Sequence, residues 1–192
     1  MPCTDYDRTM IQFEIRKQDK KTEARCGTIK TRHGMVETPN FMPVATQATV
    51  KTMSSADLED MGVQIIVCNT YHLMQRPGAD LVRSCGGLHD FMGWNHAILT
   101  DSGGFQAYSL AELKKVNDEG IMFSSHIDGA KIHLTPEKAV DIQHQLGTDI
   151  AMCLDIFTPY PSPFLEARMA VERTVQWACR SVKVKKNRLC SA

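Results

Sequence analysis

Three short apolar segments, each followed by polar residues, most constrain how this chain folds. They span residues 63–68, 96–100 and 149–154. Helical patterns alternate with them: residues 54–61 begin with a capping-box-like sequence, and residues 135–145 begin with Thr-Pro-Glu. A third helical pattern, amphipathic with a basic end, runs from about residue 163 to 185. Apolar strands that alternate with helices predict an α/β fold with a parallel sheet.

Each of these strands ends in side chains suited to binding a ligand. Asn69 and Thr70 follow the first strand, Asp101 and Ser102 the second, and Asp155 the third. The carboxyl ends of neighbouring parallel strands lie about 4.8 Å apart at one edge of the sheet, where chemistry is done in such folds. We therefore expect these side chains to surround one small planar ligand.

The turn after the second strand carries the strongest local signal. Gly103 and Gly104 follow Asp101 and Ser102, and without a Cβ atom they let the backbone approach a ligand closely. Phe105 is a candidate stacking surface for that ligand. Two simpler interpretations remain open, namely a tight turn capped by Asp101 and a Phe105 that only fills the core. A third is that Asp155 is a helix cap or turn residue.

Composition limits the class of protein. The chain has 192 residues, which suits one domain, and a formal net charge of zero, which neither supports nor excludes nucleic-acid binding. Its seven cysteines are scattered without a CxxC motif, as in reduced cytosolic proteins. No apolar run approaches the roughly 18 residues of a membrane span, so we expect a cytoplasmic protein. Residues 11–15 and 24–29 predict an antiparallel pair joined by a turn at 16–21.

Histidines and basic residues give weaker signals. The seven histidines include no HExxH or comparable pair, so we expect no metal site. His126 is interpreted either as a hydrogen-bonded structural residue or as a neighbour of the ligand. A basic cluster near the end either contacts phosphates or forms a solvated helix face; it contains Arg180, Lys183, Lys185, Lys186 and Arg188.

Five ordered blocks make the sequence resemble the tRNA-guanine transglycosylases, which exchange a guanine for queuine or its precursor at the anticodon wobble position of tRNA. The similarity covers nearly the whole chain, and its form is similar to the bacterial branch. The blocks are Thr38-Pro39-Asn40-Phe41-Met42-Pro43, Asn69-Thr70-Tyr71-His72-Leu73, Thr100-Asp101-Ser102-Gly103-Gly104-Phe105-Gln106, Ser125-His126-Ile127-Asp128-Gly129, and Asp155 with Thr158-Pro159-Tyr160-Pro161.

The resemblance implies a role for each matching residue. Asp101 matches the aspartate that accepts and donates a proton toward the exchanged purine, and residues 102–105 match the turn that forms the base pocket. Asp155 matches the aspartate that reads the Watson–Crick edge of the base, where an ionised carboxylate accepts from two adjacent donors. Phe105 would stack on the extruded base, and Asn69 and Thr70 would lie near the ribose.

The sequence also departs from the family pattern. Ile156 and Phe157 replace the usual Glu-Cys, which alters the pocket rim, and Phe105 replaces a frequent tyrosine. The resemblance implies a (β/α)₈ TIM barrel of roughly 250 residues, so 192 residues provide about its first half plus the antiparallel extension. Intact members carry the aspartate nucleophile and a structural Zn²⁺ with Cys₃His ligands in the second half. We expect neither in residues 1–192, which we interpret as a single truncated barrel domain.

The sequence thus predicts the base-recognition and proton-transfer half of a pentosyltransferase, inactive alone, whose partners are tRNA and guanine or a 7-deazaguanine. An alternative is a non-catalytic purine-binding or accessory subunit that completes a barrel as a homodimer or with another chain. A third hypothesis is an unrelated enzyme that uses Asp101 and Asp155 as a carboxylate pair for glycoside hydrolysis.

Overall fold

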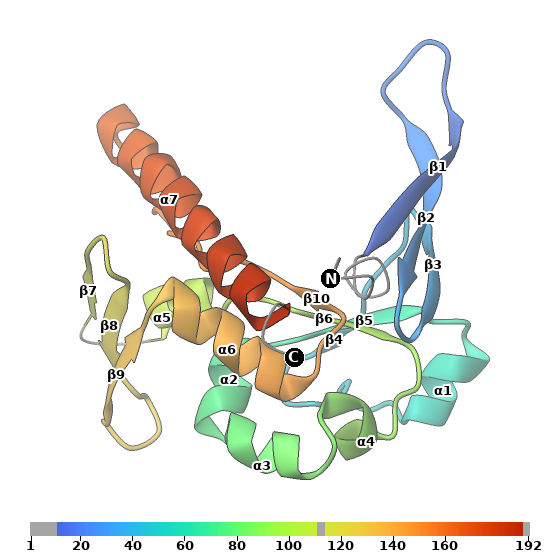
Figure 1. Cartoon of the computed structure of the whole chain (residues 1–192), viewed down its shortest axis with the longest axis horizontal. Helices are drawn as coiled ribbons and strands as arrows, with labels where there is room; N and C mark the ends of the chain where they lie inside the picture. Colours follow the sequence, from blue (N-terminus) through green and yellow to red (C-terminus); the bar gives the residue numbers. More distant parts are fainter. Residues whose placement is uncertain (1–10, 111–113, 190–192) are drawn as a thin grey trace, which may run out of the picture.

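A four-stranded parallel sheet lies at the centre of the computed structural model, which describes residues 11–110 and 114–189 (Figure 1). The strand order is β10-β6-β5-β4, so the predicted parallel sheet is confirmed, and β4 is a strand that the sequence pattern did not indicate. Among the described residues the sheet is open, with β4 and β10 at its edges. The strands are β4 (Val44–Ala45), β5 (Ile65–Cys68), β6 (Ala97–Thr100) and β10 (Ile150–Ala151).

The strand predicted over residues 149–154 is shorter than expected: only Ile150 and Ala151 pair with β6, and the Met152 N–H that follows is shared between the Thr100 carbonyl (3.2 Å) and a buried side chain. The amide of Gln143 is fully buried; its Oε1 accepts from the Met152 N–H (2.9 Å) and its Nε2 donates to the Met152 carbonyl (2.9 Å). The same amide accepts from the Thr100 hydroxyl (2.8 Å) and donates to the Ala139 carbonyl (3.0 Å). Gln143 thus pairs with the Met152 backbone as a strand would, in addition to the hydrogen bond that Met152 makes to β6.

Helices cover one face of the parallel sheet. Ile66 and Ile98 of the sheet are fully buried there, in a core shared with Leu146 and Trp177 of the helices. Figure 1 shows α6 beside α2 and α3 below the sheet. The predicted helix over 135–145 is confirmed as α6, with Thr135 as its N-cap and Gly147 in the left-handed region at its end. The helices are α2 (Thr70–Gln75), α3 (Ala79–Ser84), α4 (Leu88–Met92) and α6 (Pro136–Leu146).

The capping box predicted at the first helix is present. In α1 (Ser55–Asp60), the Ser54 hydroxyl accepts from the Asp57 N–H (3.2 Å), while the Asp57 carboxylate accepts from the Ser54 N–H (2.8 Å). The two hydrogen bonds satisfy donors that a helix start otherwise leaves unpaired.

Replacing Ser54 with alanine is therefore expected to lower the free energy of unfolding by about 1 kcal/mol. Urea denaturation followed by circular dichroism measures the change. Ser54→Asp, which restores a capping acceptor, should recover most of the loss. Equal loss in both variants would contradict a capping role.

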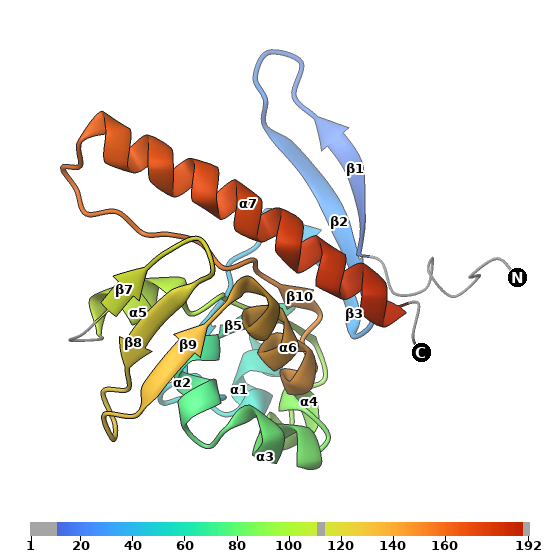
Figure 2. The same cartoon turned by 60° about the vertical axis from the view of Figure 1, so that its left-hand side comes forward.

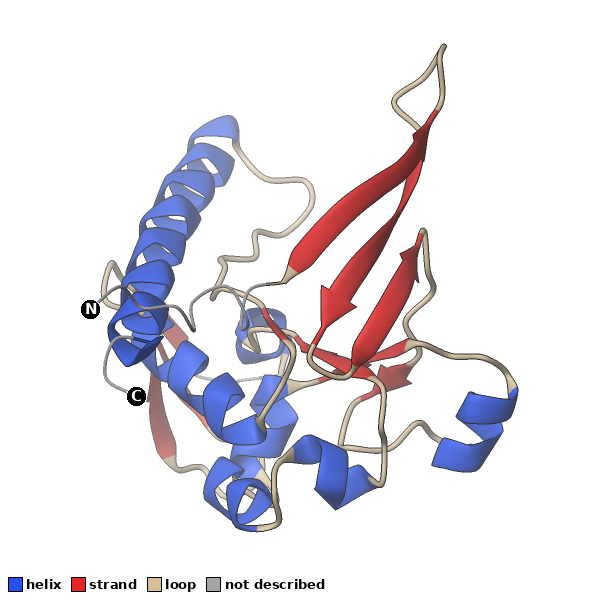
Figure 3. Ribbon diagram, turned by 45° about the vertical axis from the view of Figure 1, so that its right-hand side comes forward, coloured by secondary structure: helices blue, strands red, loops and turns tan. Residues whose placement is uncertain are grey.

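An antiparallel sheet covers part of the opposite face of the parallel sheet. The antiparallel pair expected at the start of the chain is confirmed, but the first strand continues to Gln18, so the turn falls at residues 19–24 rather than 16–21. Val36 packs against Ile65 and Ala97. Figure 3 shows this three-stranded sheet projecting away from the helices. Its strands are β1 (Gln12–Gln18), β2 (Arg25–Thr31) and β3 (Gly34–Thr38).

A second antiparallel sheet, which the sequence analysis did not predict, lies beside α5 (Gly104–Ser109) (Figure 2). Phe123 and Leu134 point from it into the main core. Its strands are short and alternate weakly, which is why their period was not evident. They are β7 (Lys114–Val116), β8 (Ile121–Ser124) and β9 (Lys131–Leu134).

The last helix, α7 (Phe164–Leu189), confirms the helix predicted from about residue 163 to 185, and only part of its apolar face is buried. Trp177 is buried and donates to the Asp118 carbonyl, whereas Leu165, Met169 and Val175 are exposed. Among the described residues, no helix has the length and apolar character needed to cross a membrane.

The basic cluster on α7 is divided between structural and exposed side chains. Arg180 makes two hydrogen bonds with Glu137 (2.6 and 2.7 Å) and donates to the Asp118 carbonyl, so it holds α7 to α6. The Arg180 side chain lowers the pKa of Glu137 to about 2, against the opposing effect of burial. Lys183 is exposed. The side chains of the other three members, Lys185, Lys186 and Arg188, lie outside the described part of the helix.

Candidate functional site

Asp101 is held at the carboxyl end of β6 by residues that follow β5. Asn69 Nδ2 donates to Asp101 Oδ2 (2.5 Å), and the Thr70 N–H donates to Oδ1 (3.1 Å). The Gly103 N–H is a third donor, also to Oδ1 (3.2 Å), and the Thr70 hydroxyl donates to the Asp101 carbonyl. Asn69 and Thr70 are both buried. The predicted convergence of the first two strand ends is therefore present, with the carboxylate fixed in one orientation.

The environment of Asp101 shifts its acidity toward neutral pH. Burial raises the pKa of Asp101 to about 6, against the hydrogen bonds from Thr70 and Gly103; the nearby charge of Asp155 raises it further, and Asn69 lowers it. Burial together with the Asp101 charge also raises the pKa of the neighbouring Cys68 thiol to about 12, so this thiol stays protonated. Asp101 is therefore suited to both accepting and releasing a proton near neutral pH.

Asp155 reaches the same turn from the segment that follows β10. The Ser102 hydroxyl donates to Asp155 Oδ1 (2.8 Å) and accepts from the Gly104 N–H (3.2 Å). Asp155 is exposed, and its Oδ2 has no hydrogen-bond partner among the described residues. The nearest helix after it, α7, begins only at Phe164, so the helix-cap interpretation of Asp155 is wrong. One carboxylate oxygen thus positions the side chain and leaves the other available to a ligand.

Gly104 fits where no other residue would. A Cβ atom there would lie 2.7 Å from the Asp155 carbonyl oxygen and 2.9 Å from its Oδ1, closer than real Cβ contacts. Gly103 has a φ of +78°, a conformation that favours glycine, and its amide faces Asp101. The two glycines together let both aspartates approach α5.

Gly104→Ala is therefore expected to displace Asp155 and to lower the free energy of unfolding by about 1–3 kcal/mol, the usual cost of overpacking. Urea denaturation measures the loss. Ser109→Ala, at an exposed position of the same helix, is the matched control and should stay within about 0.5 kcal/mol of wild type. If the Gly104→Ala chain were as stable as that control, the segment around Asp155 would be able to shift and accommodate the added Cβ atom at little cost in free energy.

The structure corrects the interpretation of Phe105 as a core residue, because its side chain is 48% exposed. Its ring meets that of Phe157 edge-on, with centroids 4.8 Å apart, and Tyr108 contacts Phe157 at 5.0 Å. Phe157 and Tyr108 are site neighbours that the sequence analysis did not assign. The signal in the sequence for Phe157 is its departure from the family pattern, and Tyr108 carries no such signal.

His126 is an exposed residue that is hydrogen-bonded to a buried tyrosine, in agreement with the structural interpretation. Its Nδ1 lies 2.9 Å from the hydroxyl of Tyr71, which is fully buried and stacks on Phe123. A Cβ atom on Gly103 would lie 3.0 Å from the Tyr71 amide nitrogen. Tyr71 thus packs directly behind the Asp101 turn, and His126 contacts its hydroxyl.

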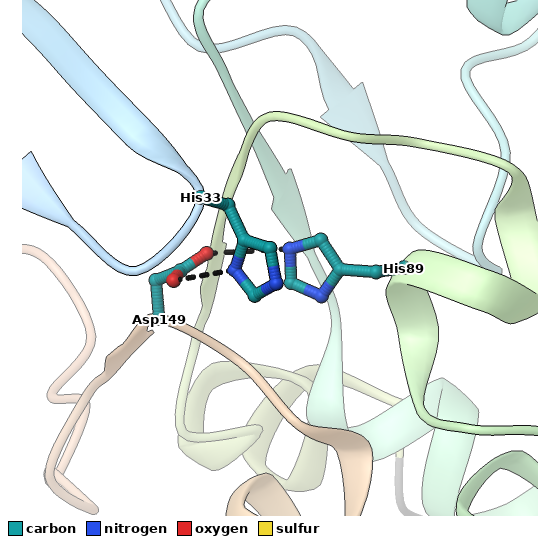
Figure 4. Close-up of side chains that lie close together, drawn as sticks. All are labelled: His33, His89 and Asp149. Atoms are coloured by element: carbon teal, nitrogen blue, oxygen red, sulfur yellow. Dashed lines mark hydrogen bonds and ion pairs between the residues drawn. The ribbon is translucent and has the colours of Figure 1, made fainter.

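A second polar cluster lies at the opposite, amino end of the sheet. His33 Nδ1 lies 2.8 Å from Asp149 Oδ1, and His89 Nε2 lies 3.3 Å from Asp149 Oδ2 (Figure 4). The two imidazole rings stack with centroids 3.5 Å apart. Among the described residues this is the one group of three side chains placed to hold a metal ion, and it contains no cysteine, so it does not fit a Cys₃His zinc site.

Comparisons with known proteins agree with these observations. The family described as "Queuine tRNA-ribosyltransferase" matches residues 19–191. Proteins named queuine tRNA-ribosyltransferase are 59% identical over 171 residues in Desulforudis audaxviator, 50% over 177 in Caldanaerobacter subterraneus and 54% over 173 in Bacillus licheniformis. These alignments cover 89%, 92% and 90% of this chain but 46%, 47% and 45% of the relatives, so the chain spans about half their length. The chain belongs to the queuine tRNA-ribosyltransferase family.

Proposed function

We propose that this chain binds a purine base and exchanges protons with it during tRNA-guanine transglycosylation. The observation that carries the proposal is that Asp101 and Asp155, from different strand ends, flank one glycine turn beside the exposed ring of Phe105. Family membership supplies the reaction class, in which guanine in tRNA is replaced by queuine or a related 7-deazaguanine.

Each carboxylate has a distinct part in this proposal. Oδ2 of Asp155 is free to accept from N1–H and the exocyclic amine of guanine, while Ser102 holds Oδ1. Asp101, with a pKa near 6, takes a proton from the incoming base and returns one to the leaving base. Phe105 stacks on the extruded base, with Phe157 bracing its edge. The nucleophilic attack on ribose is not assigned to any residue of this chain.

The open sheet supports a proposal about architecture as well. We infer that the four parallel strands belong to a (β/α)₈ barrel, because helices cover one face and the site lies at the carboxyl ends of the strands. A barrel of that kind needs further strands, which either a longer chain, a second copy of this chain or another subunit supplies. Residues 1–192 would then form part of one domain.

Binding of guanine tests the recognition step directly. Isothermal titration of the chain with guanine should give one site, which Asp155→Asn weakens at least tenfold, since a carboxylate that accepts from two donors is lost. Phe105→Ala should weaken it by a similar factor through lost stacking. Phe164→Ala, which removes a more exposed ring at 77%, is the matched control and should bind as wild type does.

Exchange of labelled guanine into unmodified tRNA tests the catalytic step. Incorporation that Asp101→Asn abolishes would show a working transglycosylase. Guanine binding without incorporation would favour the purine-binding or accessory role over catalysis by this chain. A folded chain that neither binds guanine nor incorporates it would overturn the proposal.

A further inference from the structure

The cluster of His33, His89 and Asp149 has no part in the proposed base chemistry, and its three members come from distant segments. His33 lies in the turn between β2 and β3, His89 lies in α4, and Asp149 directly precedes β10. Figure 4 shows the three side chains pointing toward one another. Their candidate ligand atoms all lie within 4.8 Å of one another.

The spacing of these atoms is close to that of a metal coordination shell. Zinc binds histidine nitrogen and carboxylate oxygen at about 2.1 Å, so neighbouring ligands of a tetrahedral ion lie about 3.4 Å apart. The nitrogen-to-oxygen distances in the cluster are 2.8 Å for His33 and 3.3 Å for His89. The stacked imidazole rings would turn so that both ring nitrogens point at one ion, with water as a fourth ligand.

The charge balance of the cluster also favours a cation. The Asp149 side chain is only 1% exposed, and its ion-pair partners among the described residues are the two histidines, with no lysine or arginine. Arg32, next to His33 in sequence, donates instead to the carbonyls of Gly147 and Thr148. A divalent ion would supply the buried carboxylate with a permanent positive charge that no lysine or arginine provides among the described residues.

The surroundings orient the ligands and leave a path for entry. The Ile98 N–H donates to Asp149 Oδ2 (3.0 Å), which fixes the carboxylate as outer-shell partners do in metal sites. The His33 side chain is 32% exposed, so an ion can reach the cluster from solvent. His89 Nε2 also lies 3.1 Å from the His96 carbonyl, a contact that metal binding would replace.

We propose that His33, His89 and Asp149 bind a divalent transition-metal ion of the Zn²⁺ class, which ties the β2–β3 turn and α4 to the amino end of the parallel sheet. Because the site lies at the end of the sheet opposite Asp101, the ion has a structural role. The proposal does not depend on the proposed function.

Titration of the metal-free chain with Co²⁺, followed by absorption spectroscopy and calorimetry, tests the site. His33→Asn and His89→Gln each place an amide donor where the imidazole nitrogen stood, so they preserve the hydrogen bonds to Asp149 while removing a metal ligand. We expect one Co²⁺ per wild-type chain, at least tenfold weaker binding in either variant, and a metal-dependent rise in melting temperature in wild type alone. His96→Gln, which removes an exposed histidine at the same end of the sheet, should behave as wild type does.

The Co²⁺ spectrum distinguishes binding at this site from binding at any of the seven cysteines. Thiolate ligation produces intense near-ultraviolet charge-transfer absorption, which nitrogen and oxygen ligation does not. Absence of binding would overturn the proposal and leave the cluster as a hydrogen-bonded contact. Binding with the thiolate spectrum, or binding equally strong in His33→Asn and His89→Gln, would overturn it as well.

Discussion

Replacing Gln143 with leucine is expected to lower the free energy of unfolding by about 2–4 kcal/mol. Leucine fills a similar volume but leaves the Met152 carbonyl without the donor that Gln143 supplies, and it leaves the Thr100 hydroxyl only a long contact with the Thr148 hydroxyl (3.4 Å). Each buried polar group left unpaired costs about 1–3 kcal/mol. Urea denaturation followed by tryptophan fluorescence measures the change, since Trp94 and Trp177 are fully buried.

Gln145→Leu is the matched control for this experiment. Gln145 lies on the same helix and donates only to Asp80, in an exposed contact of 3.2 Å, so its loss should cost less than about 1 kcal/mol. A Gln143→Leu chain no less stable than the Gln145→Leu chain would show that water satisfies the Met152 carbonyl and the Thr100 hydroxyl.

The second large effect concerns the pH dependence of stability. The pKa of Asp101 is about 6 in the folded chain, above its ordinary value of 3.8, so the folded state binds more protons between these values. The stabilisation that protonated Asp101 provides is present below pH 4 and is lost as pH rises through 6. The stability of wild type relative to Asp101→Asn should therefore fall by about 2 kcal/mol between pH 4 and pH 7.

Urea denaturation of both chains at several pH values between 4 and 7 measures this difference. The readout is its slope with pH, because the amide introduced by Asp101→Asn would also face the Asn69 amide and change the absolute stability. Asp128 is a control of opposite sign: hydrogen bonds from the Ser125 side chain and the Ala130 N–H hold its pKa below the ordinary value. The stability of wild type relative to Asp128→Asn should rise with pH. Parallel curves for wild type and Asp101→Asn would contradict the elevated pKa.

The sequence predicted those parts of the fold whose stability is local. The capping box at Ser54, the Thr135-Pro136 helix start and the apolar runs of β5 and β6 are all present, because neighbouring residues suffice to define them. The extent of β10 was not predictable in this way. Its end lies beside Gln143, whose hydrogen bonds to Met152 form only after α6 has packed.

In the candidate site, too, some features are defined by neighbouring residues and others depend on long-range packing. Asp101, Asn69 and Thr70 were predicted to meet because they directly follow neighbouring strands. The link between Ser102 and Asp155, the exposure of Phe105 and its contact with Phe157 depend on how an irregular segment returns to α5. The His33, His89 and Asp149 cluster carries no sequence motif at all, since its members are brought together only by the packing of the β2–β3 turn and α4.

The amide of Asn69 links the order of a helix to the acidity of the site. Its Oδ1 accepts from the His72 N–H (3.1 Å) as the N-cap of α2, so its Nδ2 must face Asp101. Fraying of the first turn of α2 would release the amide, remove a donor from the carboxylate and raise the pKa of Asp101 further. The pKa of Asp101 thus depends on whether the first turn of α2 is formed. Residues of that helix can therefore change this pKa without contacting a bound base.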